Sequence, residues 1–487
     1  MARGQISASA VYAVGNLARG GALLALTPFL VNSLTTDEYG RWALSEVVIL
    51  LATMVMVAGL DIGLMREYWQ LPSEKRRAET LGLLTVAVMV SGMLWFVVGL
   101  GLGTGGALDL GTGNETPWVL ALASAWTESV MALFLAHFRI REDAWVFAGF
   151  SVGRSVALVA LAILLIHMGY GVTGGLLGRF IAGTLALGGA LVLVASRRQI
   201  AFAFDKGILS RVARYGLPLL PANLASYVLL ASDRYFIGGM IGLKAVAVYS
   251  FAYKVGSTLD MLVIRPYSAD WAARRFKIAG ETDAERHYDD ALLLYLEAGT
   301  AFSLFAIALT PLGYQLLAPE VYSAGMAVVP VILLAYLVYG AAHPLNVGLM
   351  LKDRTRFLAY GAVIAAAACI ALNVRWIPQF GMSGAAWATV VSYAIYTALV
   401  ALGSLSVYPI RYSFRRIVAV IVPGLLGLLA LYGIQTLFPP DALLLKTLCN
   451  LGVAVPIGLL IFRRHVRSGL DWIRQGFEVR LTKRGGL

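Results

Sequence analysis

The sequence predicts an all-α, polytopic membrane protein of about 14 transmembrane helices, built as two six-helix bundles followed by two C-terminal helices. Three observations support this prediction: the composition is strongly apolar, long apolar runs recur along the chain, and its two halves share short motifs. Hydrophobic residues make up 59% of the 487 residues, charged residues make up 14%, and the mean hydropathy is +0.77. A soluble domain is nearer to about half apolar and a quarter charged, so a soluble fold is excluded.

The predicted spans follow one another at short intervals along the chain. Each has about 18 or more residues with few charges, which is long enough to cross the hydrocarbon core of a bilayer. Because Arg19 interrupts the first apolar run and no cleavage site follows it, we expect a retained helix there rather than a signal peptide. In order, the spans are 10–33, 44–65, 80–103, 117–138, 146–167, 173–195, 215–240, 246–268, 291–312, 326–350, 357–375, 384–404, 417–436 and 444–462.

Lysine and arginine residues gather in alternate connections between these spans. The positive-inside rule places such connections in the cytoplasm, and an even number of helices then puts both termini there too. This distribution, rather than one basic face, also argues against nucleic-acid binding despite the net charge of +12. The residues concerned are Arg66, Lys75, Arg76, Arg77, Arg139, Arg141, Arg197, Arg198, Lys206, Arg211, Arg214, Arg274, Arg275, Lys277, Arg286, Lys352, Arg354, Arg356, Arg411, Arg415 and Arg416.

The two halves of the chain share motifs at corresponding positions. Asn16-Leu17-Ala18 of the first span aligns with Asn223-Leu224-Ala225 of the seventh. GVTG at 171–174 aligns with GMSG at 381–384, ahead of the sixth and twelfth spans. Two copies of an even-numbered helical unit run in the same direction, which is the parallel kind of transporter repeat, with the substrate path between the copies.

This repeat predicts four parts of the chain. Residues 1–200 form an N-terminal six-helix bundle, and residues 201–408 form a second one. Residues 409–462 hold helices 13 and 14, and residues 463–487 form a basic cytoplasmic tail. We expect transport by rocking of one repeat against the other.

Ten charged residues inside the spans of the two repeats are candidates for a functional role. A charge at the middle of the bilayer costs at least about 2.5–3.5 kcal/mol, so such residues usually face a bundle interior or a wet cavity and indicate a functional path. The cations are Arg19, Arg154, Arg179, Arg234 and Lys254, and the anions are Asp61, Glu128, Asp233, Asp260 and Glu297.

Helical geometry places several of these cations on polar stripes. Tyr12, Asn16 and Arg19 share one face of the first span, and Asn223, Tyr227 and Arg234 share one face of the seventh. Asp233 directly precedes Arg234 in the sequence and therefore lies on a different face of the helix. We expect it to contact a neighbouring helix or the edge of the lumen. Arginine binds phosphate oxygens in pairs and lysine offers a point charge, so these stripes together with Lys254 predict an anion-binding vestibule.

The other membrane charges have two interpretations each. Glu128 and Arg154 lie at the same depth of adjacent antiparallel helices, which predicts either an ion pair or a place in the lumen. Arg154 and Arg179 are candidates for substrate binding or for fixed partners inside the bundle. Asp61 is a candidate for proton coupling or for a pair with Arg66, and coupling or gating is the role expected of all five anions.

Three stretches carry a resemblance to a known family, the polysaccharide (O-antigen type) flippases of the multidrug/oligosaccharidyl-lipid/polysaccharide superfamily. The first combines Asp233-Arg234, Phe236-Ile237-Gly238, Tyr249 and Ala252-Tyr253-Lys254. The second is LAPEVYSAGMAVVP at 317–330, and the third is IPQFGMSGAAWATVVSY at 377–393. GLDIGL at 59–64 is similar to that family's motif at the end of the second helix.

The resemblance implies a flippase for an oligosaccharide on polyprenyl pyrophosphate, working by alternating access in the bacterial plasma membrane. Relatives hold the headgroup on lumenal cations while the tail stays in lipid or lies along the last helices. On this interpretation Arg19, Arg234 and Lys254 bind the pyrophosphate, and Tyr12, Asn16, Asn223 and Tyr227 bind sugars. Thr27 occupies the position equivalent to Arg234, so we expect an asymmetric site. Membrane lipids and other polysaccharide export proteins are the expected partners.

Three alternatives remain open. A multidrug exporter of the same superfamily would favour an acidic or aromatic lumen for organic cations, and a lipid II flippase would share the cationic lumen. A membrane glycan polymerase or ligase would need a larger extramembrane loop with convergent catalytic groups. We expect no metal or cofactor, because Cys369, Cys449 and His343 have no companion ligands at metal spacing and no phosphate-binding loop is present.

Overall fold

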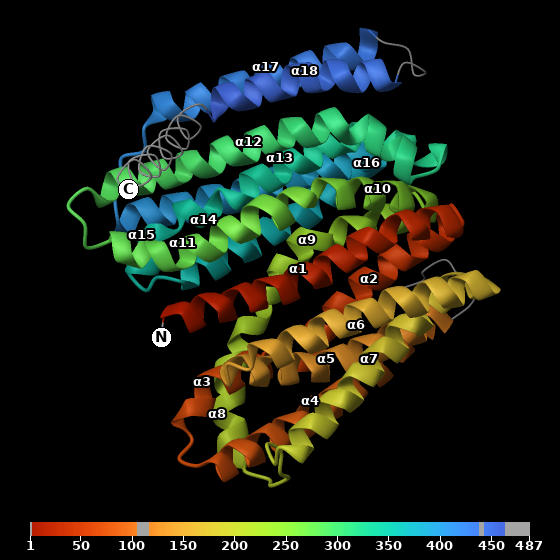
Figure 1. Ribbon diagram of the computed structural model, residues 1–487, viewed down its shortest axis with the longest axis vertical. Coiled ribbons are helices and arrows are strands. Elements are labelled where there is room, and N and C mark those ends of the chain that lie inside the picture. Colours follow the sequence, from red (N-terminus) through yellow and green to blue (C-terminus); the bar gives the residue numbers. More distant parts are fainter. Residues whose placement is uncertain (1, 105–115, 438–442, 463–487) are drawn as a thin grey trace, which may run out of the picture. The chain divides into compact units, whose positions relative to one another are not determined.

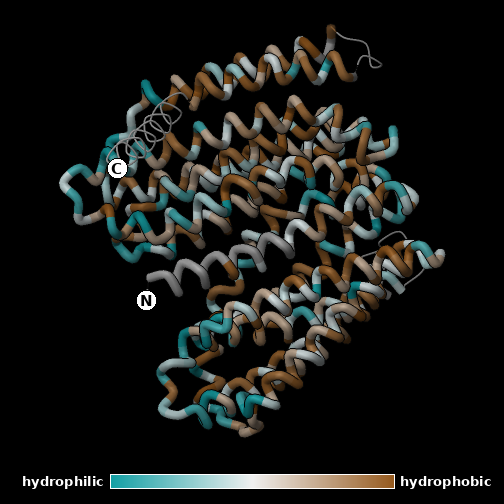
Figure 2. The backbone as a smooth tube through the Cα atoms, viewed as in Figure 1, coloured by the Kyte–Doolittle hydropathy of each residue, from teal (hydrophilic) through white to brown (hydrophobic). Residues whose placement is uncertain are grey.

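The computed structural model is helical, and no strand occurs in the part of the chain that it describes (Figure 1). It describes residues 2–104, 116–437 and 443–462, apart from the side chains of residues 2–10, 12–14, 16–19, 103–104, 435–436 and 443. Hydrophobic residues cover most of the length of the helices, and hydrophilic residues gather at their ends and connections (Figure 2). This pattern suits a bilayer, where helices satisfy their own backbone hydrogen bonds.

The chain separates into two compact units. The first comprises Met1–Phe251 and Ala362–Ala385, and the second comprises Ala252–Gly361 and Ala386–Leu487. The division into bundles at 1–200 and 201–408 stays a prediction.

The first unit is built mainly from the first nine helices. They are α1 (Ala2–Ser33), α2 (Thr36–Val57), α3 (Leu60–Glu67), α4 (Glu74–Thr104), α5 (Thr116–Ile140), α6 (Ala144–Leu165), α7 (Gly171–Ser196), α8 (Lys206–Gly216) and α9 (Leu220–Met240). Within this unit α6 packs on α1 and α7, and α5 packs on α2, α4 and α7. Phe134, Phe138 and Phe147 lie fully buried in its main hydrophobic core.

The remaining helices lie wholly or partly in the second unit. They are α10 (Leu243–Gly256), α11 (Arg265–Ile278), α12 (Ala284–Leu317), α13 (Val329–Gly340), α14 (Ala342–Leu345), α15 (Val347–Leu351), α16 (Arg356–Val407), α17 (Phe414–Leu437) and α18 (Leu443–Ile461). Here α12, α17 and α18 pack on one another.

The prediction of about 14 spans is confirmed. Nine helical segments of the described chain are long and apolar enough to cross a membrane. Two of them, Ala144–Ser196 and Arg356–Val407, contain a break in helical geometry and correspond to two predicted spans each. The other predicted spans correspond to α1, to α9, and to α10 with the π-helical turn η4 (Asp260–Ile264) that follows it.

The two breaks lie at aligned glycines. Gly171 has φ 52° and ψ −141°, and Gly381 has φ 59° and ψ −138°. These nearly equal angles fall in a region of backbone conformation that is essentially restricted to glycine. The motifs GVTG and GMSG thus adopt the same local structure, as expected of a repeat.

The second predicted span begins and ends at definite signals. At its start, the Thr35 side chain accepts from the Glu38 backbone N–H at 3.3 Å, and the Glu38 carboxylate accepts from the Thr35 N–H at 2.9 Å, which is a capping box. The helix begins eight residues before the predicted span 44–65, and it also ends before that span does, because Ala58 and Gly59 both have positive φ. The helix stops there, and α3 begins at Leu60.

Candidate functional site

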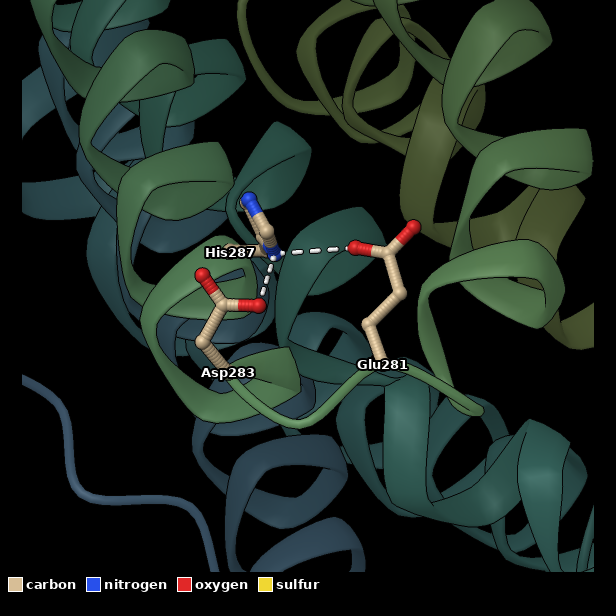
Figure 3. Close-up of side chains that lie close together, drawn as sticks. All are labelled: Glu281, Asp283 and His287. Carbon is tan, nitrogen blue, oxygen red and sulfur yellow. Dashed lines mark ion pairs between the residues drawn. The ribbon is translucent and has the colours of Figure 1, made fainter.

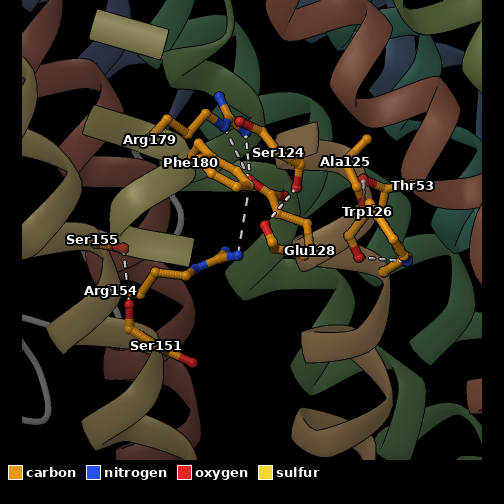
Figure 4. A network of polar contacts seen from close by, with 12 residues as sticks. Thr53, Ser124, Ala125, Trp126, Glu128, Ser151, Arg154, Ser155, Arg179 and Phe180 are labelled. Carbon is orange, nitrogen blue, oxygen red and sulfur yellow. Dashed lines mark hydrogen bonds and ion pairs between the residues drawn. The ribbon is translucent and has the colours of Figure 1, made fainter. Parts of the chain in front are cut away.

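Four charged side chains meet inside the first unit, one from each of α2, α5, α6 and α7. They are Glu46, Glu128, Arg154 and Arg179, which we call the ionic cluster (Figure 4 labels all but Glu46). Glu128 and Arg179 are both more than nine-tenths buried. Because the cluster joins two arginines to two glutamates, its formal charges cancel inside the membrane.

Arg179 is the centre of the ionic cluster. Its Nε and Nη2 donate to the same oxygen of Glu128, at 3.0 and 2.9 Å. Its Nη1 donates to Glu46 on α2. One guanidinium therefore links three helices, which the planar fork of arginine allows and the point charge of lysine does not.

Arg154 approaches the same Glu128 oxygen from α6, with its Nη1 at 3.8 Å (Figure 4). The predicted ion pair between adjacent helices is therefore confirmed. The substrate-binding role of Arg154 and Arg179, and the coupling role of Glu128, stay predictions.

Small residues bring these helices close enough for the ionic cluster to form. Ala121 and Ala125 on α5 are fully buried, and Ala182 on α7 is 1% exposed. Small side chains at such positions let helix backbones approach closely in a membrane. The arginine and glutamate side chains of neighbouring helices can then reach one another.

Glu46 is the member of the ionic cluster that the sequence analysis missed. It lies inside the predicted span 44–65, in the run SEVVILL. A carboxylate within an apolar run is the same signal that identified Glu128, so a stricter count of charges in the spans would have included it.

Asp233 is buried where α9 meets α10. One carboxylate oxygen accepts the Arg234 backbone N–H at 2.8 Å, and the other accepts the Tyr249 hydroxyl at 2.5 Å. The prediction that Asp233 contacts a neighbouring helix is therefore confirmed. Both hydrogen bonds stabilise its carboxylate inside the bundle.

Tyr227 does not lie on an open polar stripe in this structure. It is 4% exposed, packs against Val47 and Ala231, and its hydroxyl donates to the Val47 carbonyl of α2. Helical periodicity predicted the face of the helix on which Tyr227 lies. It could not predict that α2 covers that face. Asn223, on the same helix, is half-buried.

The cations assigned to the pyrophosphate are placed only in part. Arg234 is half-buried in α9 and belongs to the first unit, whereas Lys254 is half-buried in α10 and belongs to the second. The side chains of Tyr12, Asn16 and Arg19 lie outside the described residues. Their roles stay predictions.

Asp61 lies in the first turn of α3. The pair with Arg66 considered from the sequence is not formed, because the Arg66 guanidinium lies over the Tyr215 ring, 4.2 Å from its centroid. Asp61 thus starts a short separate helix rather than ending the second span. Its coupling role is untested.

The two remaining anions lie in the second unit. Asp260 begins the π-helical turn and accepts from the Arg265 Nε at 2.8 Å. Glu297 is 5% exposed inside α12. Their coupling roles also stay predictions.

Glu281, Asp283 and His287 form a small cluster before and within the first turn of α12 (Figure 3). The His287 Nδ1 lies 3.1 Å from Glu281 and 3.5 Å from Asp283. Both carboxylates are exposed. Because exposed acidic groups are common without a bound ion, we assign no ligand to this cluster.

Comparison with known proteins identifies the family of the chain. The family model "Polysaccharide biosynthesis protein" matches residues 7–269. No protein of curated function matches the chain in sequence.

Solved structures show the same fold. One is the lipid II flippase MurJ in an inward closed conformation, with a TM-score of 0.75 and 12% identity, covering 93% of this chain and 99% of that one. Another is an inward-facing multidrug resistance MATE family transporter, with a TM-score of 0.62, 14% identity and coverage of 84% and 95%. A third is a mutant of the Vibrio cholerae MATE transporter VcmN, with a TM-score of 0.55, 14% identity and coverage of 82% and 95%.

Proposed function

The chain belongs to the family of polysaccharide biosynthesis proteins, and we propose that it is a lipid-linked oligosaccharide flippase. Its cargo is an oligosaccharide on polyprenyl pyrophosphate, and it turns this lipid from the inner to the outer leaflet of a bacterial plasma membrane. Both termini then lie in the cytoplasm, as the positive-inside rule predicts.

One observation carries the proposal. The family match spans residues 7–269, which include the three cations assigned to the pyrophosphate, Arg19, Arg234 and Lys254. Arginine stays charged when it is desolvated and pairs with phosphate oxygens, so it suits a pyrophosphate that must leave water. A cation substrate would be repelled by the same groups.

An apolar cavity in the second unit supports a lipid cargo. It has a volume of about 390 Å³ and lies between α12, α13, α16 and α17. Leu304, Leu333, Leu425 and Leu428 are among its lining residues. We assign this cavity to part of the polyprenyl tail, in agreement with a tail that lies along the last helices.

Transport in this proposal follows alternating access, with the two repeats rocking against each other. Asp61, Glu128, Asp233, Asp260 and Glu297 are the candidates for coupling or gating. Coupling to an ion gradient or to the membrane potential fits carboxylates placed inside membrane helices.

A binding measurement on the purified protein tests the cargo. Native mass spectrometry and thermal shift would compare a polyprenyl-pyrophosphate oligosaccharide, lipid II and an organic cation, on the wild type and on Arg19→Ala and Arg234→Ala. We expect the oligosaccharide lipid to stabilise the wild type most and to lose this effect in both variants.

Each other result would change the assignment. Stronger stabilisation by lipid II would make the chain a lipid II flippase. Stabilisation by the organic cation, retained in both variants, would favour a drug exporter whose acidic residues line the path.

A further inference from the structure

A second cavity of the second unit lies at the start of α17 and has a volume of about 440 Å³. It is bounded by α12, α17 and α18, and most of its wall is aliphatic, with Leu293, Val418, Val422 and Leu460 among the lining residues. Charged side chains line it as well, two arginines from α17 and Glu297 from α12. A cavity whose wall is mostly aliphatic, with arginines at one end, matches the polarity of an anionic membrane lipid.

The two arginines of this cavity differ in their contacts. Arg416 is engaged through both of its terminal nitrogens, because its Nη1 lies 2.8 Å from Asp289 and its Nη2 pairs with Asp290. Asp289 also accepts the Ser413 backbone N–H at 2.9 Å. These contacts fix the start of α17 on α12 and leave Arg416 little capacity for a ligand.

Arg415, by contrast, is exposed and forms no hydrogen bond or ion pair with any described residue. Val418 and Val422 lie three and seven positions after it, on the same face of α17. A ligand whose anionic group binds Arg415 can therefore extend its acyl chain along the aliphatic wall of the cavity. Phe414, just before it, is 74% exposed, as aromatic residues at a membrane interface often are.

We propose that this cavity binds an anionic phospholipid, with the phosphodiester on Arg415 and one acyl chain along Val418, Val422 and Leu460. Basic pockets between membrane helices on the positively charged side recognise anionic headgroups. Arg415 belongs to the connection that carries Arg411 and Arg416, so the lipid comes from the leaflet that these cations face.

Glu297 lies deeper in the cavity than the two arginines. It is seven residues beyond Asp290, the partner of Arg416, on α12, which corresponds to about 10 Å along the helix axis. The arginines therefore lie at the mouth of the cavity, which places the headgroup there, beside Arg415. The site uses none of the cations assigned to the cargo, so it can be tested independently of the proposed function.

Native mass spectrometry of the full chain tests the site. Dioleoyl phosphatidylglycerol and dioleoyl phosphatidylcholine, which share their acyl chains, would be titrated against wild type, Arg415→Ala and Arg411→Ala. We expect wild type to prefer phosphatidylglycerol by about fivefold, the effect of one basic residue beside an anionic headgroup. Arg415→Ala removes this preference. Arg411→Ala keeps it, because Arg411 is exposed on the same connection but does not line the cavity.

A third variant and a free anion separate a lipid site from a simple anion site. Val418→Trp fills the cavity and should weaken both lipids, while the melting temperature without lipid confirms that the variant folds. Unchanged phosphatidylglycerol preference in Arg415→Ala would overturn the proposal. The proposal would also be overturned by two results together. Inorganic phosphate at equal concentration would displace the lipid from the wild type, and Val418→Trp would still bind both lipids fully.

Discussion

The Arg179 guanidinium donates two hydrogen bonds to a single carboxylate oxygen of Glu128, from Nε at 3.0 Å and from Nη2 at 2.9 Å. Both side chains are more than nine-tenths buried. An isolated charge at such a position would cost several kcal/mol, and the pairing is what makes burial tolerable. Together with Glu46 and Arg154, it ties four helices of the first unit to one another.

Replacement of Glu128 by Gln should therefore destabilise the protein strongly. It removes one of the two negative charges of the ionic cluster and leaves Glu46 as the cluster's remaining carboxylate for two arginines, so we expect a loss of about 3–5 kcal/mol. Thermal unfolding in detergent measures the effect. Glu74→Gln is the matched control, because Glu74 is exposed and its ion pairs with Arg77 and Arg141 contribute about 0–1 kcal/mol. An equally small effect at both positions would contradict a structural role for the ionic cluster.

A double replacement separates stability from transport at the same site. Glu128→Met with Arg179→Met removes one charge of each sign, but it also removes the partner of Arg154 and the partner of Glu46. Exchanging the buried pair for apolar residues costs little, whereas each remaining charge loses its ion pair, so we expect folding to recover only in part. Export that also recovers would show that the ionic cluster is purely structural and that the coupling role of Glu128 is wrong.

The sequence was sufficient for those parts of this site that depend on position along a helix. Hydropathy predicted the membrane spans, and equal depth in the membrane predicted the contact between Glu128 and Arg154. It could not give the contact of Arg179 with Glu46, because that depends on which helices are neighbours. The same limit explains Tyr227, whose face was predicted correctly while the helix covering that face was unknown.

Tyr249→Phe tests the other buried carboxylate. The Tyr249 hydroxyl donates to Asp233 at 2.5 Å, and its removal leaves one carboxylate oxygen without that donor. We expect a stability loss of about 1–3 kcal/mol, the usual penalty for an unsatisfied buried group. Tyr432→Phe, which removes a hydroxyl from a 69% exposed residue, is the control and should change the melting temperature little. Similar melting curves for both variants would argue against a stabilising role for this hydrogen bond.

Gly59→Ala tests the close approach of α3 and α8. A Cβ at Gly59 would lie 2.5 Å from the Gly216 carbonyl oxygen, and the residue has φ 71°. Backbone strain alone costs about 1–3 kcal/mol, and the clash with backbone adds to it. Gly153→Ala is the control, because no heavy atom lies within 4 Å of its Cβ position and alanine favours a helix interior. A destabilised control, or an unaffected Gly59→Ala variant, would contradict this packing.

Arg234 is the residue on which the proposed function can be tested in cells. Arg234→Ala should abolish glycan export while the protein stays folded in the membrane, and Arg234→Lys should be partly active because it keeps charge but loses the fork. Surface polysaccharide and the level of membrane-inserted protein are the two measurements. Arg411→Ala removes the same charge from an exposed connection and should export normally. Full export by Arg234→Ala would remove this residue from the cargo site.

The aligned glycines Gly171 and Gly381 allow a comparison of the same strain in two surroundings. Both have φ between 52° and 59°, so alanine at either position should cost about 1–3 kcal/mol through the backbone. A Cβ at Gly381 would meet only the Ile241 side chain, at 4.0 Å, whereas a Cβ at Gly171 would clash with the Glu38 carboxylate. We therefore expect Gly171→Ala to be the more destabilising variant.

The extra cost at Gly171 should depend on Glu38, because Glu38 forms the capping box with Thr35 at the start of α2. Displacing its carboxylate removes that cap, which contributes about 0.5–2 kcal/mol. In a Glu38→Ala background the cap is already lost and the clash is gone. Gly171→Ala and Gly381→Ala should then cost the same, and thermal unfolding of the two double variants measures this coupling. A difference that persists without Glu38 would place the additional strain elsewhere in the first repeat.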